Sequence, residues 1–278
     1  MEGFEMIVEP KDAATVILLK KPHGTGEEGF KVLMVLRHPD SKFVPDSYVF
    51  PGGCLDEDDY APEMENLCTG MDQQRALDVL DNIVSPETAL GAWVAGIRET
   101  FEEVSLLLAY QRDGSLIKFD SEDMVKRFCS YRLSLFDGKL KLKDLLREED
   151  LTLAVDRLHY FSHWITPEFL PLRYDVRFFV AEAPERQEAI HDGVELTKHV
   201  WITPQDALGR FREKRCNMVL PTLVTMKELS QYKTIDEVIR TTKEKKINGI
   251  LTKMVESNGE IVEYMPNGQA FKGMPRSI

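Results

Sequence analysis

Cysteine is scarce in this sequence, and the four cysteines lie far apart along the chain. They form no C-x-x-C pair, so we expect neither a zinc site nor a disulfide framework. Long apolar runs are also missing, which argues against a membrane-spanning helix. Residues 1–5 lack the basic and apolar regions of a secretory signal, and residues 275–278 do not match the peroxisomal S-K-L address. These absences predict a cytoplasmic protein with reduced thiols.

Positive charge is in short supply as well. The chain has 35 lysine and arginine residues against 47 aspartates and glutamates, which gives a formal net charge of −12. Such a surface repels nucleic acids and anionic membranes, so we expect a small-molecule partner and leave a homodimer open. An anionic substrate would need local attraction from a bound metal ion and a few basic side chains. With 278 residues, 43% of them hydrophobic, the chain is long enough for one domain with an added lobe.

Three carboxylates stand at helical spacing in the stretch G-I-R-E-T-F-E-E-V, residues 96–104. Glu99, Glu102 and Glu103 share one face of the expected helix. The opposite face is an apolar stripe made of Trp93, Ile97, Phe101, Val104 and Leu108. Like charges at this spacing cost about 0.2–0.5 kcal/mol per pair, a penalty that a bound Mg²⁺ or Mn²⁺ would reverse. A solvated acidic face is the ordinary alternative.

A glycine turn lies upstream of this helix. Residues 13–20 and 30–37 are rich in β-branched side chains, and a glycine-rich link at 22–29 joins them. This pattern predicts a β-hairpin. A short strand at 48–50 then stops at the P-G-G of residues 51–53. Proline ends the ladder there, and the two glycines let the backbone approach a ligand closely.

Helical and strand-like segments alternate along the rest of the chain. Ser85 before Pro86 is a suitable N-cap, so the acidic helix should run from Pro86 to about Tyr110. Further helices are expected near 72–83, 121–136, 143–153, 203–208, 221–232 and 241–246, and further strands near 158–165, 173–182, 200–202 and 261–265. This order predicts an α+β protein. One domain would span residues 1–232, with an inserted lobe near 60–90 and a helical segment near 121–153. A C-terminal extension would occupy residues 233–278.

The P-G-G turn and the later R-E-x-x-E-E at 98–103 resemble the Nudix box, G-x5-E-x7-R-E-U-x-E-E-x-G-U, where U is aliphatic. W-I-T-P-Q-D-A-L at 201–208 is similar to the W-x-x-x-E-A-L that often follows in this family. Residues 36–56, 163–167 and 173–179 are similar to the branch that contains the mammalian peroxisomal coenzyme A diphosphatase. The resemblance covers roughly 13–232. It implies the Nudix fold, a mixed β-sheet sandwiched between helices (α/β/α), with a helical insertion and a C-terminal extension that packs on the domain.

This sequence departs from the box in three places. The segment between Gly53 and Arg98 is much longer than the plain box allows, which we interpret as the inserted lobe. Asp59 stands at the position of the first box glutamate, with Glu57 as a rival for its role. Ser105 stands where the box has a glycine.

Family members hydrolyse a nucleoside diphosphate linked to another group. The resemblance therefore implies a metal-dependent hydrolase that cleaves the diphosphate bond of coenzyme A or acyl-coenzyme A into 3′,5′-ADP and a phosphopantetheine. By match to the box, Glu99, Glu102, Glu103 and the carbonyl of Gly53 would bind Mg²⁺ or Mn²⁺. A carbonyl ligand also suits glycine, because the backbone must come into contact with the ion.

The same resemblance implies a role for Arg98 and the presence of a general base. Arg98 would pair with the acid that replaces the box glutamate and orient Glu99; an exposed helical pair with Glu102 is the simpler interpretation. The catalytic residues would be Arg98, Glu103 and a base, which is either Glu99 or Glu195. Family members differ in whether the base comes from the box or from a later loop.

Contacts to the substrate phosphates need basic side chains. The candidates are Arg37, Lys42, Arg173 and Arg177, although an ordinary surface cation is the better interpretation of each one taken alone. Two other functions remain open. One is a Nudix diphosphatase of another nucleoside diphosphate derivative, such as ADP-ribose or a dinucleotide. The other is a non-catalytic nucleotide-binding Nudix module, which typically loses the R-E-x-x-E-E carboxylates that this chain retains.

Overall fold

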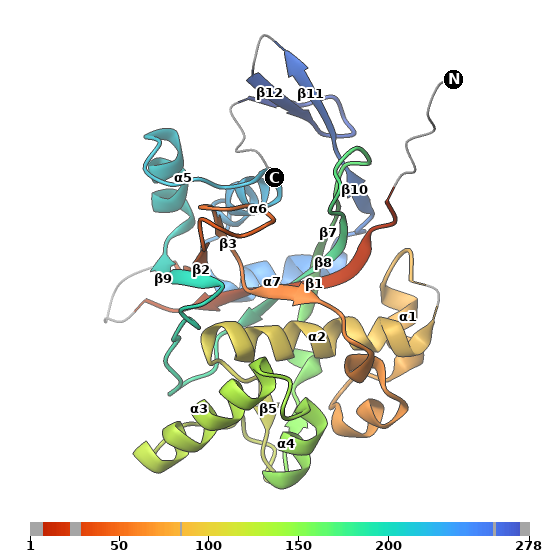
Figure 1. The fold of residues 1–278 in the computed structure, drawn as a ribbon, viewed down its shortest axis with the longest axis vertical. Coiled ribbons are helices and arrows are strands. Elements are labelled where there is room, and N and C mark those ends of the chain that lie inside the picture. Colours follow the sequence, from red (N-terminus) through yellow and green to blue (C-terminus); the bar gives the residue numbers. More distant parts are fainter. Residues whose placement is uncertain (1–7, 23–28, 84, 258–259, 273–278) are drawn as a thin grey trace.

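The computed structural model describes residues 8–22, 29–83, 85–257 and 260–272. The first five residues, most of the glycine-rich link and the last four residues therefore lie outside the described part. At the centre of Figure 1 is a β-sheet with helices on both sides. No helix in the described ranges is both long and apolar enough to cross a membrane.

The central sheet has mixed strand directions. Its order is β10-β7-β8-β1-β2-β3, with β4 also paired to β1 and β9 also paired to β2. The pairs β1–β8 and β7–β10 are parallel, and the others are antiparallel, including the predicted hairpin β1–β2. The strands are β1 (Lys11–Lys20), β2 (Lys31–Arg37), β3 (Tyr48–Val49), β4 (Gly52–Cys54), β7 (His159–Ile165), β8 (Tyr174–Glu182), β9 (Leu196–Ile202) and β10 (Gly249–Leu251).

Alternate side chains of the strands pack into two hydrophobic cores, one on each face of the sheet. In β1, Val16 and Leu18 join the core that contains α2 (Pro86–Val104), whereas Ile17 and Leu19 join the core that contains α6 (Leu220–Leu229). This is the period-two geometry of a strand buried on both faces. Figure 1 shows α2 on one side of β1 and α7 (Ile235–Glu244) on the other. The predicted α/β/α arrangement is therefore confirmed.

Helix α2 begins where the sequence predicts and ends earlier. The Ser85 hydroxyl accepts a hydrogen bond from the backbone N–H of Thr88 at 3.1 Å, and Pro86 is the first helical residue. The predicted end near Tyr110 was wrong, because the helix stops at Val104. Ser105 adopts a left-handed conformation with φ of 64°, which no helix continues through. The chain then enters β5 (Ala109–Tyr110), which pairs with β6 (Thr152–Leu153).

The remaining helices are shorter than α2. Those before and after the acidic helix are η1 (Glu57–Tyr60), η2 (Pro62–Leu67), α1 (Gln73–Val79), α3 (Glu122–Phe136), α4 (Leu142–Glu148), η3 (Val155–Arg157) and α5 (Pro204–Arg212). Helix α4 is shorter than predicted because Asp150 takes a left-handed φ of 54° before β6. Helix α7 starts earlier than predicted because Thr234 and Glu237 form a capping box.

The C-terminal extension contributes to two sheets. Strand β10 adds to the edge of the central sheet beside β7. Strands β11 (Lys253–Ser257), β12 (Glu260–Tyr264) and β13 (Ala270–Lys272) then form a separate antiparallel sheet. In Figure 1, β11 and β12 (blue) stand beyond β10, away from α2.

Candidate active site

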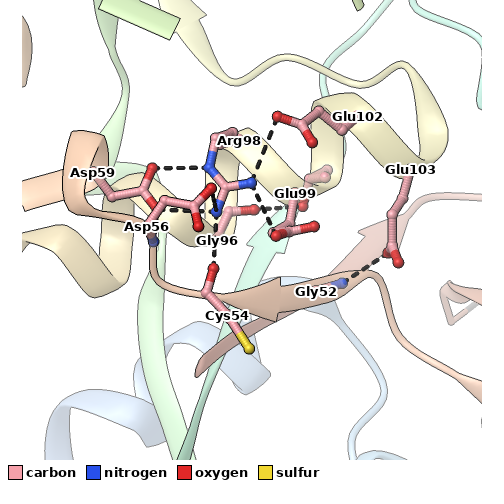
Figure 2. Close-up of polar contacts among 10 residues, drawn as sticks. Gly52, Cys54, Asp56, Asp59, Gly96, Arg98, Glu99, Glu102 and Glu103 are labelled. Atoms are coloured by element: carbon pink, nitrogen blue, oxygen red, sulfur yellow. Dashed lines mark hydrogen bonds and ion pairs between the residues drawn. The ribbon is translucent and has the colours of Figure 1, made fainter. Parts of the chain in front are cut away.

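Arg98 on α2 is buried and lies at the centre of the polar contacts in Figure 2. Its Nε and Nη2 atoms donate to the two carboxylate oxygens of Asp59, each at 2.9 Å, the bidentate geometry of a planar guanidinium. Nη1 donates to Glu99 at 2.9 Å, and Nη2 also donates to the carbonyl of Cys54 at 2.8 Å. Glu102 lies 3.5 Å from Nη1. Arg98 thus joins β4, η1 and α2 instead of forming an exposed helical pair.

Asp59, not Glu57, is the acid that Arg98 contacts. Asp59 lies buried in η1 and also accepts a hydrogen bond from the backbone N–H of Asp56 at 2.8 Å. Glu57 lies in the same short helix and is exposed. Burial raises the pKa of Asp59, whereas its hydrogen bonds with Arg98 lower it. The start of the inserted segment is thereby fastened to α2.

Glu99, Glu102 and Glu103 of α2 lie where burial disfavours their negative charge. The Glu103 side chain is buried, and its Oε2 accepts a hydrogen bond from the backbone N–H of Gly52 at 2.8 Å. Burial raises the pKa of Glu103 well above its usual value, and the neighbouring Glu99 raises it further. Burial also raises the pKa of Glu99 to about 7, against the lowering effect of Arg98, and raises the pKa of Glu102. Titratable groups with such perturbed pKa values often mark functional sites.

The glycine turn lies in contact with these carboxylates. A Cβ atom built on Gly53 would lie 2.4 Å from Cδ and Oε1 of Glu99. A Cβ atom on Gly52 would lie 2.3 Å from the carbonyl oxygen of Ala14 on the neighbouring strand. Both positions therefore need glycine because of close approach, as the P-G-G motif predicts. The structure brings the backbone of Gly53 and the side chain of Glu99 together.

A cavity of about 540 Å³ opens over this arrangement. Its acidic part is lined by Gly53, Glu99, Glu102, Glu103, Asp192 and Glu195. Aromatic and aliphatic side chains line much of the remainder, among them Phe43, Phe50, Trp164, Tyr174, Val176, Phe178 and Leu220. A concave site with apolar walls and a few converging polar groups is typical of small-molecule binding.

The four basic candidates divide into two groups. Arg37 lines the cavity, and its Nε is buried without a hydrogen-bond partner among the described residues. Lys42 is exposed and lies outside the cavity lining. Arg173 is buried and donates to the carbonyls of residues 8 and 166. Arg177 is fully buried and contacts Asp12 and the carbonyl of residue 175. The structure brings neither Arg173 nor Arg177 to the cavity.

The loop before β9 places Glu195 at the cavity. Glu195 is exposed, and its negative charge contributes to the raised pKa of Glu103. One oxygen of Asp192 holds the loop by accepting hydrogen bonds from the backbone N–H groups of residues 194 and 195, at 2.5 and 2.6 Å. Its other oxygen is buried and has no partner in the described part of the chain. Sequence reasoning missed Asp192, although an aspartate before Gly193 signals such a turn.

The donors around the cavity suit a hard divalent cation. Among the described residues, no three His, Cys, Asp or Glu side chains already converge closely enough to enclose an ion. The groups available are nevertheless all oxygens, from carboxylates on α2 and the backbone at Gly53. Mg²⁺ and Mn²⁺ both prefer this donor chemistry. The raised pKa of Glu103 beside Glu99 marks a place where positive charge would be stabilising.

Comparison with known proteins identifies the family. The protein-family model described as the NUDT19 Nudix domain matches residues 10–91 and 80–229 of the sequence. The acyl-coenzyme A diphosphatase NUDT19 of Xenopus laevis is 22% identical over 236 residues, covering 75% of this chain and 62% of that protein. The human protein of the same name is 24% identical over 238 residues, covering 76% and 63%. This chain thus spans less than two thirds of the length of these relatives.

The fold has a solved counterpart. The crystal structure of a Nudix hydrolase from Alicyclobacillus acidocaldarius superposes with a TM-score of 0.64 at 24% identity, covering 84% of this chain and 96% of that one. The family match extends from the start of the central sheet to α6, and it includes the glycine turn and the acidic helix. This chain therefore belongs to the Nudix hydrolase family, in the group described by the NUDT19 Nudix domain.

Proposed function

We propose that this protein hydrolyses the diphosphate bond of coenzyme A or acyl-coenzyme A, giving 3′,5′-ADP and the corresponding phosphopantetheine. The observation that carries the proposal is the cavity in which Gly53 lies together with Glu99, Glu102 and Glu103 beside apolar walls. An acidic site can bind cations for an anionic diphosphate, and apolar walls suit the less polar ends of the substrate. The relatives named acyl-coenzyme A diphosphatase support the substrate class.

Mg²⁺ or Mn²⁺ would bind to Glu99, Glu102, Glu103 and the carbonyl of Gly53. When bound, the cation supplies charge neutralisation for the diphosphate and lowers the pKa of a water molecule. Arg98 is not a ligand in this proposal. It fixes the rotamer of Glu99 through a 2.9 Å hydrogen bond and is itself fixed by Asp59.

The reaction needs one proton acceptor. The water oxygen forms a bond to phosphorus, the bond from that phosphorus to the bridging oxygen breaks, and the bridging oxygen leaves with the second phosphate. The proton lost by the water passes to a carboxylate, which is Glu99 or Glu195. Glu99 lies in the acidic part of the cavity beside Gly53, whereas Glu195 is the more accessible of the two.

Arg37 is the basic residue that we assign to the substrate. It lines the cavity and has a donor without a partner among the described residues, so a phosphate oxygen would satisfy it. Lys42 would at most contact the substrate outside the cavity. We assign no substrate contact to Arg173 or Arg177, because neither lines the cavity.

A substrate panel tests the proposal. The purified protein is assayed with Mg²⁺ or Mn²⁺ on coenzyme A, on dephospho-coenzyme A and on ADP-ribose. We expect the highest kcat/KM for coenzyme A, with a loss of about tenfold or more when its 3′-phosphate is removed, because a charge-assisted hydrogen bond is lost. Turnover of ADP-ribose with coenzyme A left intact would contradict the substrate assignment and favour another Nudix diphosphatase.

A further inference from the structure

The C-terminal sheet supplies part of the cavity wall. Thr252, Met254 and Glu263 line the same cavity as the glutamates of α2, although they come from the other end of the chain. The pairing of β10 with β7 sets Leu251 opposite Ile165, so Thr252 follows beside a wall segment that includes residues 165–167. Glu263 on β12 pairs with Met254 on β11. Residues of the β11–β12 hairpin thus extend the cavity lining beyond the Nudix motif.

Glu263 is an acidic residue placed in this wall without a cationic partner. Its residue exposure is 7%, and no Lys or Arg in the described part of the chain forms an ion pair with it. The Thr252 hydroxyl donates a hydrogen bond to its Oε1 at 2.5 Å. Its Oε2 accepts no hydrogen bond from the described residues and is not one of the fully buried atoms without a partner, so it is accessible where Glu263 lines the cavity. Burial raises the pKa of Glu263, and the Thr252 hydrogen bond lowers it only partly.

A buried carboxyl with one hydroxyl donor is unfavourable for folding alone. Desolvation of a carboxylate is penalised more strongly than a single neutral hydrogen bond offsets. Apolar residues would seal this wall at lower energetic cost, as they do elsewhere in the cavity. Because Glu263 lines a ligand-sized cavity, a donor group on the bound molecule would satisfy its second oxygen.

We propose that Glu263 is a specificity-determining residue that accepts a hydrogen bond from an N–H or O–H group of the substrate lying beyond the diphosphate. Thr252 is its positioning residue, since its hydroxyl holds one oxygen of the carboxyl by a hydrogen bond. This inference rests on the proposed function, because it takes the cavity to be the substrate site. For coenzyme A the donor would come either from the amino group of the base or from an amide or hydroxyl of the pantetheine arm.

The test compares wild type, Glu263→Ala and Glu263→Gln in the full chain on three diphosphates. These are coenzyme A, its analogue with hypoxanthine in place of adenine, and a methyl ester of 3′-phospho-ADP that lacks the pantetheine arm. With coenzyme A we expect Glu263→Ala to lower kcat/KM about 10- to 100-fold, chiefly through KM. Glu263→Gln should lose less, because its amide oxygen still accepts a hydrogen bond.

The two analogues locate the donor. A Glu263→Ala effect that disappears with the methyl ester assigns the donor to the pantetheine arm, and one that disappears with the hypoxanthine analogue assigns it to the base. Either result supports the proposal. An equal loss on all three substrates, or no loss on coenzyme A, would overturn it. Glu256→Ala is the matched control, since Glu256 lies on the same hairpin and is exposed; it should match wild type in kcat/KM.

Equilibrium binding separates this inference from the proposed function. Titration calorimetry of coenzyme A into metal-free protein requires no turnover. Absence of hydrolysis by the wild type would contradict the proposed function alone, provided that coenzyme A still binds more weakly to Glu263→Ala than to wild type. Equal affinity of the two proteins, or no binding by either, would overturn the role of Glu263. Melting temperatures close to that of wild type confirm that the variants are folded.

Discussion

Arg98 stabilises a buried group of acids that would otherwise repel one another. Its side chain is 9% exposed and that of Asp59 is 1% exposed, so water screens their attraction little. Removing the guanidinium leaves the Asp59 carboxylate desolvated and without its cation. The ion pair therefore matters for folding as well as for the geometry of Glu99.

Substitution of Arg98 should destabilise the protein strongly. We expect Arg98→Met to lower the free energy of unfolding by about 3–5 kcal/mol, the usual result of breaking one half of a buried pair. Arg98→Lys should lose less of the free energy of unfolding, because lysine keeps the positive charge and loses only the bidentate hydrogen bonds. Urea denaturation measures both. Arg127 offers a control, because it forms a similar fork with Glu149 at the surface. Arg127→Met should lose no more than about 1 kcal/mol, and equal losses at the two sites would contradict this reasoning.

Glu99 makes the metal-free protein less stable as pH rises. Burial raises its folded-state pKa from 4.5 to about 7, so between these values the folded state binds more protons than the unfolded state. Stability contributed by the neutral carboxyl is present below pH 4.5 and is lost as pH rises through 7, by an amount on the order of 3 kcal/mol. Divalent cations should oppose this loss, because they stabilise the ionised carboxylate.

The corresponding variant is Glu99→Gln, which cannot ionise. In EDTA we expect wild type to lose melting temperature between pH 5.5 and pH 7.5, and Glu99→Gln to lose less over the same interval. The comparison reports Glu99 together with its effect on the pKa of the neighbouring Glu103. Glu256→Gln, at an exposed site, should follow wild type. Parallel curves for wild type and Glu99→Gln would contradict the assigned pKa shift.

At the scale of elements, the site depends on how closely β4 approaches α2. Gly53→Ala would place a Cβ atom 2.4 Å from the Glu99 carboxyl, so the carboxyl or the strand must move. Since a misplaced catalytic group is costly in rate, we expect a loss of kcat of about 10²-fold with the protein still folded. Gly209→Ala is a control, because a Cβ there meets nothing within 4 Å and the residue lies on the distant α5. An active Gly53→Ala would contradict the need for close contact between β4 and the Glu99 carboxyl in catalysis.

Sequence reasoning predicted the elements whose local signals agree with their packing. The Ser85–Pro86 start of α2 and the β1–β2 hairpin follow from capping chemistry and β-branched runs. The end of α2 was missed because Ser105, a residue without a strong left-handed preference, takes the conformation that usually signals glycine. The choice between Asp59 and Glu57 was left open, because adjacent acids differ only in which one the folded chain buries.

At the scale of the whole molecule, the features that were hard to predict depend on contacts between residues far apart in the sequence. The family motif correctly predicted that Gly53 and the α2 glutamates meet across a long insertion. The sequence offered Arg177 as a candidate contact to the substrate but did not reveal that its side chain is buried against Asp12. The contribution of Glu263 to the cavity depends on where the C-terminal hairpin folds back, for which the local sequence carries no signal.

Hydrolysis of coenzyme A in ¹⁸O-labelled water tests the central claim most directly. With Mg²⁺ or Mn²⁺, mass spectrometry should find 3′,5′-ADP and phosphopantetheine, with one ¹⁸O atom in the phosphate of one product. EDTA should stop the reaction, and Glu103→Gln should slow it about 10²- to 10³-fold, the scale of a lost electrostatic contact in a transition state. Intact coenzyme A, or labelled products formed equally fast in EDTA or by Glu103→Gln, would contradict a metal-dependent diphosphatase at this site.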